Sequence, residues 1–326
     1  MKNIALLITV LTLFSIYAGP AAAQGINGGK PPIEIKPGTF EFFMKNGLEQ
    51  FSKNNFDQAI SEYEKALKIR PADVDALYNM GLCFQYKKDN QAAMRCYEKA
   101  LAADPRHYAA NLNAGIASDD MGKTGDALTY LLKAASLEPG RFEAYYNLSN
   151  IYLAQKKYAE AIDACRRGLA ANPVHDRLHN NLGNALFNTS NAQEAIKCAQ
   201  TAALINPKNE TAFFNLGTYY EKAGEPKAAM ENYKKALEIK PDHYDAQLNL
   251  AILEAESGNL ISGEARLAKN KLLNPADARA YYNLGVIYSM KNENQKALAE
   301  FKAALERDAS YAAELEPYIK QLSGGK

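Results

Sequence analysis

The stretch YYNLSNIY at residues 145–152 returns as YYNLGVIY at residues 281–288. Related stretches are LYNMGLCF at residues 77–84 and FFNLGTYY at residues 213–220. Their apolar and aromatic residues recur at helical spacing, so each stretch predicts a helix. Each also carries an asparagine near its centre, although asparagine is a mediocre helix former. The recurrence therefore indicates repeated helices with a shared constraint beyond helix formation.

Seven prolines follow a strict period of 34 residues. They are Pro71, Pro105, Pro139, Pro173, Pro207, Pro241 and Pro275. The next position of the series is Ala309. A fixed period without insertions indicates stacked repeats. Because proline cannot continue a helical hydrogen-bond ladder, we expect each one to end the second helix of its repeat.

Columns of small residues keep the same period. The eighth position holds Gly47, Gly81, Gly115, Ser149, Gly183, Gly217, Ala251 and Gly285. Small residues let two antiparallel helices approach closely. The pattern divides the chain into eight predicted repeats: 40–73, 74–107, 108–141, 142–175, 176–209, 210–243, 244–277 and 278–308.

These columns resemble the tetratricopeptide repeat (TPR) family over residues 40–308. The matching signature is Tyr145, Leu148, Ser149, Tyr152, Ala161 and Pro173, with Tyr281, Leu284, Gly285, Tyr288 and Ala297 in the last repeat. The resemblance implies an all-α, right-handed superhelical solenoid of eight helix-turn-helix repeats that binds other proteins. Residues 309–326 carry a further apolar stripe, broken by Pro317, and we expect them to cap the last repeat.

The first 39 residues differ from the repeats. Residues 1–23 combine a basic Lys2, an apolar run and a small-residue cleavage site at Ala21-x-Ala23, which predicts a secretory signal peptide. An uncleaved N-terminal anchor is the alternative. Residues 24–39 are rich in Gly and Pro and predict a flexible leader. We therefore expect an exported protein, periplasmic or secreted, without a membrane span after cleavage.

Composition and the absence of known motifs argue against several classes of function. The 326 residues include 38 basic and 37 acidic ones, and this balance argues against nucleic acid as a partner. No phosphate-binding glycine loop, HExxH or GxSxG motif occurs, so we expect no enzyme and no cofactor. His175 and His179 are spaced for metal chelation but lack a third ligand, so we expect no metal site.

The four cysteines match no metal or redox spacing. They are Cys83, Cys96, Cys165 and Cys198. We expect all four to be small buried residues of helices. A disulfide between Cys83 and Cys96 is the alternative.

The sixth position is asparagine in repeats two to eight. These residues are Asn79, Asn113, Asn147, Asn181, Asn215, Asn249 and Asn283. One interpretation is packing between repeats. The other is pairing with a bound peptide backbone, because an amide both donates and accepts hydrogen bonds. The row resembles the asparagine ladder in the superhelical repeats of O-linked N-acetylglucosamine transferase, which implies a groove that holds an extended partner segment.

Two further sets of side chains are candidate groove contacts. Even-numbered repeats carry an aromatic residue at the fifth position: Tyr78, Tyr146, Phe214 and Tyr282. We expect these to be anchors facing the groove, with core packing as the alternative. Repeat five adds Asn184 and Asn188 on the face of Asn181, and Asn150 lies one repeat earlier. This polar face is either the centre of a groove or simply solvated. The histidines His107, His175 and His243 follow the same two-repeat period.

Taken together, the sequence predicts a scaffold or assembly factor of the cell envelope that binds an extended segment of a partner protein. One alternative is a structural protein that associates with itself. Another is a non-catalytic subunit of an envelope enzyme complex.

Overall fold

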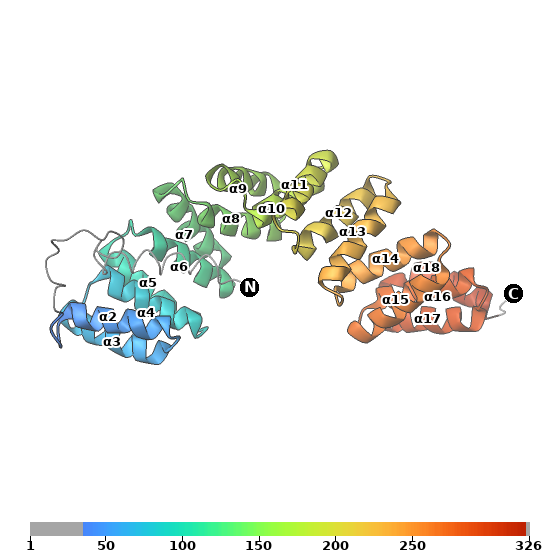
Figure 1. Ribbon diagram of the computed structural model, residues 1–326. Coiled ribbons are helices and arrows are strands. Elements are labelled where there is room, and N and C mark those ends of the chain that lie inside the picture. Colours follow the sequence, from blue (N-terminus) through green and yellow to red (C-terminus); the bar gives the residue numbers. More distant parts are fainter. Residues whose placement is uncertain (1–34, 324–326) are drawn as a thin grey trace, which may run out of the picture. The chain divides into compact units, whose positions relative to one another are not determined.

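The computed structural model describes residues 35–323, and every regular element in that part is helical (Figure 1). Each predicted repeat contains one antiparallel pair of helices. The first helices are α2 (Phe40–Ser52), α4 (Val74–Tyr86), α6 (Tyr108–Asp120), α8 (Phe142–Ala154), α10 (Asp176–Asn188), α12 (Glu210–Lys222), α14 (Tyr244–Glu256) and α16 (Ala278–Met290). The second helices are α3 (Phe56–Ile69), α5 (Asn90–Ala103), α7 (Thr124–Leu137), α9 (Tyr158–Ala171), α11 (Ala192–Ile205), α13 (Pro226–Ile239), α15 (Leu260–Leu273) and α17 (Asn294–Arg307). The predicted signal peptide and most of the predicted leader lie outside the described residues.

The second helices end two residues before the periodic prolines. The residue between is extended, as at Arg70 (φ −128°, ψ 86°) and Asn206 (φ −131°, ψ 91°). This follows from the clash of the proline ring with a helical conformation of the residue before it. Repeat eight ends in the same conformation at Asp308 (φ −147°, ψ 103°), although Ala309 follows. The helix end is therefore also fixed by the turn into the C-terminal segment.

Glycine at the eighth position makes room for a buried ring of the second helix. A Cβ atom at Gly81 would lie 2.5 Å from the Tyr97 ring, and one at Gly217 would lie 2.4 Å from the Tyr233 ring. Both rings are fully buried. The small-residue column thus lets a large aromatic side chain fill the space between paired helices.

The described part of the chain forms two compact units, which divide between Pro173 and Val174. The sequence predicts a single run of repeats and gives no sign of this division. The described core of the first unit includes Met44, Tyr97 and Leu131, and that of the second includes Tyr233 and Leu250. All four cysteines are buried, as expected.

The C-terminal segment caps repeat eight. It consists of a 3-10 turn, η1 (Ala309–Tyr311), and helix α18 (Ala312–Leu322). Leu315 joins the core formed by Tyr281 and Phe301. Helix α18 continues through Pro317, so this proline does not break the apolar stripe as the sequence predicts.

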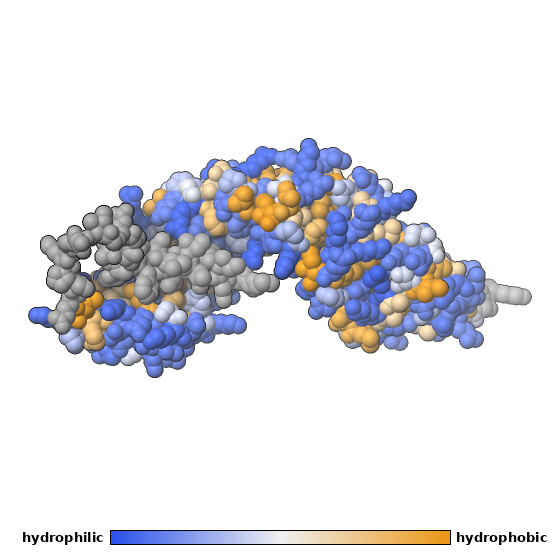
Figure 2. All heavy atoms as spheres, viewed as in Figure 1, coloured by the Kyte–Doolittle hydropathy of each residue, from blue (hydrophilic) through white to orange (hydrophobic). Residues whose placement is uncertain are grey.

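The visible surface is mostly hydrophilic, with small separate apolar patches (Figure 2). Large apolar side chains that are exposed include Leu204 (82%) and Leu272 (82%), both on second helices. Between residues 35 and 323, no helix is both long and apolar enough to span a bilayer.

Candidate functional site

The periodic histidines cap the first helices of the odd-numbered repeats. The Nδ1 atom of His107 accepts a hydrogen bond from the Ala110 amide at 3.0 Å at the start of α6. His175 and His243 cap α10 and α14 in the same way. Capping needs the neutral imidazole, because a protonated Nδ1 cannot accept.

Two of the fifth-position aromatic rings pack on capping histidines. The ring of Tyr78 lies 5.2 Å from His107, and that of Phe214 lies 4.7 Å from His243. In repeat eight, Tyr311 replaces the histidine and stacks on Tyr282 at 5.0 Å. The aromatic and histidine periods of the sequence thus describe one packing unit.

In the first unit, part of the asparagine row is buried. Asn113 is 1% exposed and donates from Nδ2 to the Tyr78 hydroxyl at 2.9 Å. Tyr78 is 2% exposed, and Asn79 is buried as well. The prediction that Tyr78, Asn79 and Asn113 face a groove is therefore corrected. These side chains lie between helices, where the amide and the hydroxyl pair with each other instead of with a ligand.

Other members of the row bond within their own helix. Asn147 donates to the carbonyl of Glu143 at 2.8 Å, and Asn283 donates to that of Arg279 at 2.8 Å. Both side chains are half-buried, and each keeps its Oδ1 atom as a further acceptor. Tyr146, Asn150 and Asn181 are also half-buried, and none of these residues lines the pocket described below.

The C-terminal segment engages Tyr282. Its hydroxyl donates to Glu314, and this bond, together with burial, raises the pKa of Tyr282 to about 12. With Tyr311 stacked on its ring, Tyr282 packs against the cap and is not the open groove anchor that the sequence predicts.

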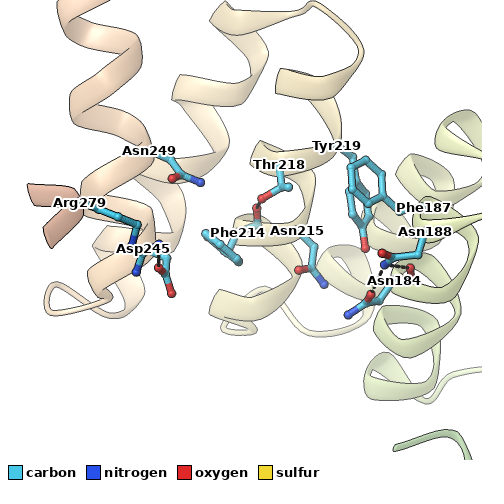
Figure 3. Close-up of a pocket in the computed structure, with 10 residues that line it drawn as sticks. All are labelled: Asn184, Phe187, Asn188, Phe214, Asn215, Thr218, Tyr219, Asp245, Asn249 and Arg279. Atoms are coloured by element: carbon cyan, nitrogen blue, oxygen red, sulfur yellow. Dashed lines mark hydrogen bonds and ion pairs between the residues drawn. The ribbon is translucent and has the colours of Figure 1, made fainter. Parts of the chain in front are cut away.

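A pocket of about 320 Å³ lies in the second unit (Figure 3). It joins α10, α12, α14 and α16, the first helices of four consecutive repeats. Five of its residues are predicted from the sequence: Asn184, Asn188, Phe214, Asn215 and Asn249. Five others are not: Phe187, Thr218, Tyr219, Asp245 and Arg279.

One end of the pocket holds an ion pair. Arg279 Nη1 lies 3.1 Å from Asp245 Oδ1, and Arg279 Nη2 lies 2.6 Å from Asp277 Oδ2. These bonds, first of all the one to Asp277, raise the pKa of Arg279 further. The cation is therefore matched by carboxylates of the protein itself.

The amide of Asn249 is held in place by a hydrogen bond to Tyr233, on the second helix α13. It donates from Nδ2 to the Tyr233 hydroxyl at 3.1 Å, and that hydroxyl donates to Glu221 at 2.7 Å. In contrast, the amide of Asn215 has no hydrogen-bond partner among residues 35–323. The pocket thus presents one oriented amide and one uncommitted amide on adjacent repeats.

The opposite end of the pocket is formed by α10 and α12. Asn188 donates to both the carbonyl and the Oδ1 atom of Asn184, at 2.9 and 2.8 Å. The ring of Tyr219 stacks on Phe187, with centroids 4.6 Å apart. Tyr219 is 3% exposed, and its hydroxyl has no partner in the described part of the chain.

One substitution in the repeat pattern explains why the ring of Tyr219 is buried against repeat five. Position 24 holds a large side chain in six repeats, such as Tyr97 and Tyr233, and Cys165 in repeat four, whereas repeat five has the smallest residue, Ala199. Tyr219 fills this space from the following repeat, and its ring would lie 3.5 Å from a Cβ atom on Gly183. The small residue at position 24 is the signal in the sequence that would have indicated the change.

Comparison with family models covers most of the repeats. A model described as "TPR repeat" matches residues 47–88. Models described as "Tetratricopeptide repeat" match residues 74–107, 112–176, 175–242, 221–269 and 278–311. The chain belongs to the tetratricopeptide repeat family.

Several solved structures are similar to this chain, and pilF and the Cut9-Hcn1 structure, named below, share its fold. "Crystal structure of MamA protein" is 30% identical, with 52% of this TPR chain and 92% of that chain covered and a TM-score of 0.48. Pseudomonas aeruginosa pilF is 19% identical (67% and 97% covered, TM-score 0.58). The "APC/C hetero-tetramer Cut9-Hcn1" structure is 15% identical (86% and 55% covered, TM-score 0.60). No curated protein sequence matches the TPR chain.

TPR arrays are typically non-catalytic interaction scaffolds. Over residues 35–323, no group of three or more His, Cys, Asp or Glu side chains is arranged to hold a metal ion.

Proposed function

We propose that this TPR protein binds an extended segment of a partner protein in the pocket of its second unit, and that it acts as a scaffold or assembly factor of the cell envelope. The observation that carries the proposal is the pocket itself, which joins the first helices of four consecutive repeats. Its amides can pair with any peptide unit, whatever the sequence of the bound segment.

The repeat spacing suits an extended chain. Neighbouring helices pack about 8–10 Å apart, and an extended chain advances about 3.3 Å per residue. One repeat therefore meets about every third residue of a bound segment. Asn215 and Asn249, on adjacent repeats, would hold two such peptide units.

The amides and the aromatic rings contribute differently to the free energy of binding. Each hydrogen bond contributes about 0.5–1.5 kcal/mol, whereas ordering each peptide residue costs about 1–2 kcal/mol. The amides alone cannot hold the segment. In this proposal they set its register, while burial of apolar surface on Phe187 and Phe214 supplies most of the affinity.

The envelope location rests on residues 1–23. We expect the exported protein to begin at Gln24, which N-terminal sequencing of the secreted or periplasmic fraction would show. A mature chain that begins at Met1 contradicts export with cleavage.

Site-specific photocrosslinking tests the proposed groove. A benzophenone amino acid replaces Asn188, which is exposed and lines the pocket, or, as the matched control, Leu204, which is exposed on α11. We expect crosslinks to another protein from position 188 and few from position 204. Equal yields contradict the groove, and a product of twice the chain's own mass identifies self-association instead.

A further inference from the structure

We propose that the α10–α12 end of the pocket is a subsite for an uncharged amide side chain, glutamine or asparagine, of the bound segment. We name this end the amide subsite; it is formed by Asn184, Phe187, Asn188, Asn215 and Tyr219. The inference rests on the proposed function and specifies which residue the bound segment carries.

The first argument is charge. None of the five residues of the amide subsite is ionisable at neutral pH except Tyr219, and burial raises the pKa of Tyr219 so that it stays neutral. The charged residues of the pocket, Asp245 and Arg279, pair with each other at its other end (Figure 3). A carboxylate or ammonium group entering the subsite would lose its hydration without gaining a counter-charge. The ligand side chain is therefore neutral.

The second argument is unsatisfied hydrogen-bonding capacity. The buried Tyr219 hydroxyl has no partner among the described residues, and its end of the ring points toward the side of the pocket that carries Asn184 and Asn188 (Figure 3). A buried hydroxyl without a partner is unfavourable, so a ligand that supplies an acceptor gains affinity. Asn215 adds an uncommitted donor and acceptor close by. A primary amide, which offers one carbonyl and two N–H donors, matches this set better than an aliphatic side chain.

The third argument is shape and access. Phe187 and Tyr219 stack nearly parallel, with 25° between their planes, and form an aromatic wall against which a planar amide can lie. Asn188 is exposed and bonds to Asn184, one turn earlier on the same helix, so the subsite includes amide side chains that solvent and a ligand can reach. At about 320 Å³, the pocket lies at the small end of ligand-sized sites and fits side chains rather than a folded partner.

The subsite is a property of one repeat. Position 10 is Tyr only at Tyr219; the other seven repeats carry Glu49, Cys83, Ala117, Ile151, Ala185, Leu253 and Ile287 there. The backbone-pairing amides recur along the chain, whereas this arrangement occurs once. It would therefore fix the position of one particular ligand residue, which a uniform row of asparagines cannot do.

The test uses the full chain and a phage-displayed library of random 12-residue peptides. We expect selected peptides to share a Gln or Asn, and replacement of that residue by Leu or Glu to weaken binding at least about fivefold in fluorescence anisotropy. In Tyr219→Phe, which keeps the ring, the preference for Gln over Leu should disappear. The matched control is Tyr63→Phe, which also removes a buried, unpartnered hydroxyl but lies in the first unit; it should keep the preference.

The outcomes separate the two proposals. If no peptide binds above background, the proposed function fails. If peptides bind but show no shared Gln or Asn, or prefer an acidic residue, the amide subsite is wrong while the groove stands. If the preference survives in Tyr219→Phe with unchanged strength, the amide is recognised elsewhere and the subsite is again wrong. Thermal melts of both variants should match the wild type, since neither hydroxyl has a partner to lose.

Discussion

Repeats two and three of the first unit and repeats six and seven of the second share one framework, and one of their differences is the hydroxyl group at position five. In the first unit, Tyr78 accepts a hydrogen bond from Asn113 of the next repeat, and both are buried. In the second unit, Phe214 occupies the position of Tyr78 and has no hydroxyl. Asn249, on the repeat that follows Phe214, donates a hydrogen bond to the Tyr233 hydroxyl and lines the pocket. The same asparagine row thus contributes to packing in one place and to an open surface in the other.

The comparison shows that a repeated residue does not imply a repeated role. Which role an asparagine takes depends on the side chains packed beside it. Asn113 lies buried against the hydroxyl of Tyr78 at position five, whereas Asn249, beside the phenyl ring of Phe214, bonds to Tyr233 and stays half-buried at the pocket.

The largest effect on stability is expected for Tyr78→Phe. Removal of the hydroxyl leaves the buried Nδ2 of Asn113 without its acceptor, which should lower the free energy of unfolding by about 1–3 kcal/mol. Urea denaturation followed by circular dichroism measures it. Tyr63→Phe is the control, because the Tyr63 hydroxyl has no partner. Equal stabilities of the two variants would break the comparison.

The reciprocal change, Phe214→Tyr, should make the second unit resemble the first. By analogy with Tyr78, the new hydroxyl would accept the second N–H of Asn249, whose first N–H donates to Tyr233, so neither N–H remains for a bound segment. We expect affinity for a library-selected peptide to fall about threefold to tenfold, which corresponds to one hydrogen bond. Isothermal titration calorimetry measures the change. An unchanged affinity would mean that Asn249 does not contact the peptide.

Acid should weaken the cap of α6 in the first unit. Burial lowers the pKa of His107 below its usual 6.5, and Asp75, Asp104 and Glu138 offset this only in part. Because the folded pKa is depressed, the stabilisation by the neutral cap is complete above pH 6.5. It is lost as the pH falls from there through the folded pKa. Melting curves from pH 7.5 to 5 should show a decrease that shrinks in His107→Asn, which caps without titrating. An identical pH dependence in the variant contradicts this role.

The smallest effect is expected for Asn147→Ala and Asn283→Ala. Each side chain donates to a carbonyl one turn earlier in its own helix, and that carbonyl is also available to the backbone ladder. Alanine is the better helix former, so stability should change by no more than about 0.7 kcal/mol, in either direction. Loss of more than this in a urea titration would show that these amides hold neighbouring repeats together.

The sequence predicts the helix pairs well, because the proline and glycine columns report on local backbone and close packing. The close packing of Gly217 against the second helix, for example, can be predicted from the sequence of its own repeat. The pocket was predicted only in part. Asn215 and Asn249 follow from the 34-residue period and Asn184 from helical spacing within repeat five. Tyr219, in contrast, reaches the site by filling the space that Ala199 leaves.

Burial of the asparagine row could not be read from spacing either. Asn113 and Asn249 occupy the same repeat position, and only the side chain packed beside each one decides its exposure. A periodic pattern identifies which residues are equivalent in the backbone. It does not show which of these residues differ in burial and in role, because both depend on side-chain contacts between repeats.

The central claim is that the buried asparagines Asn79 and Asn113 pack the first unit, whereas Asn215 and Asn249 bind a partner segment in the second. The most direct test is calorimetric titration of a library-selected peptide into two double variants, Asn215→Ala with Asn249→Ala and Asn79→Ala with Asn113→Ala. The account predicts that the first pair weakens binding about fivefold to 150-fold, from two lost hydrogen bonds, and leaves the melting temperature nearly unchanged. It predicts that the second pair lowers the melting temperature and leaves the affinity of the folded protein unchanged. Equal binding losses in both pairs, or full affinity in the first, would contradict it.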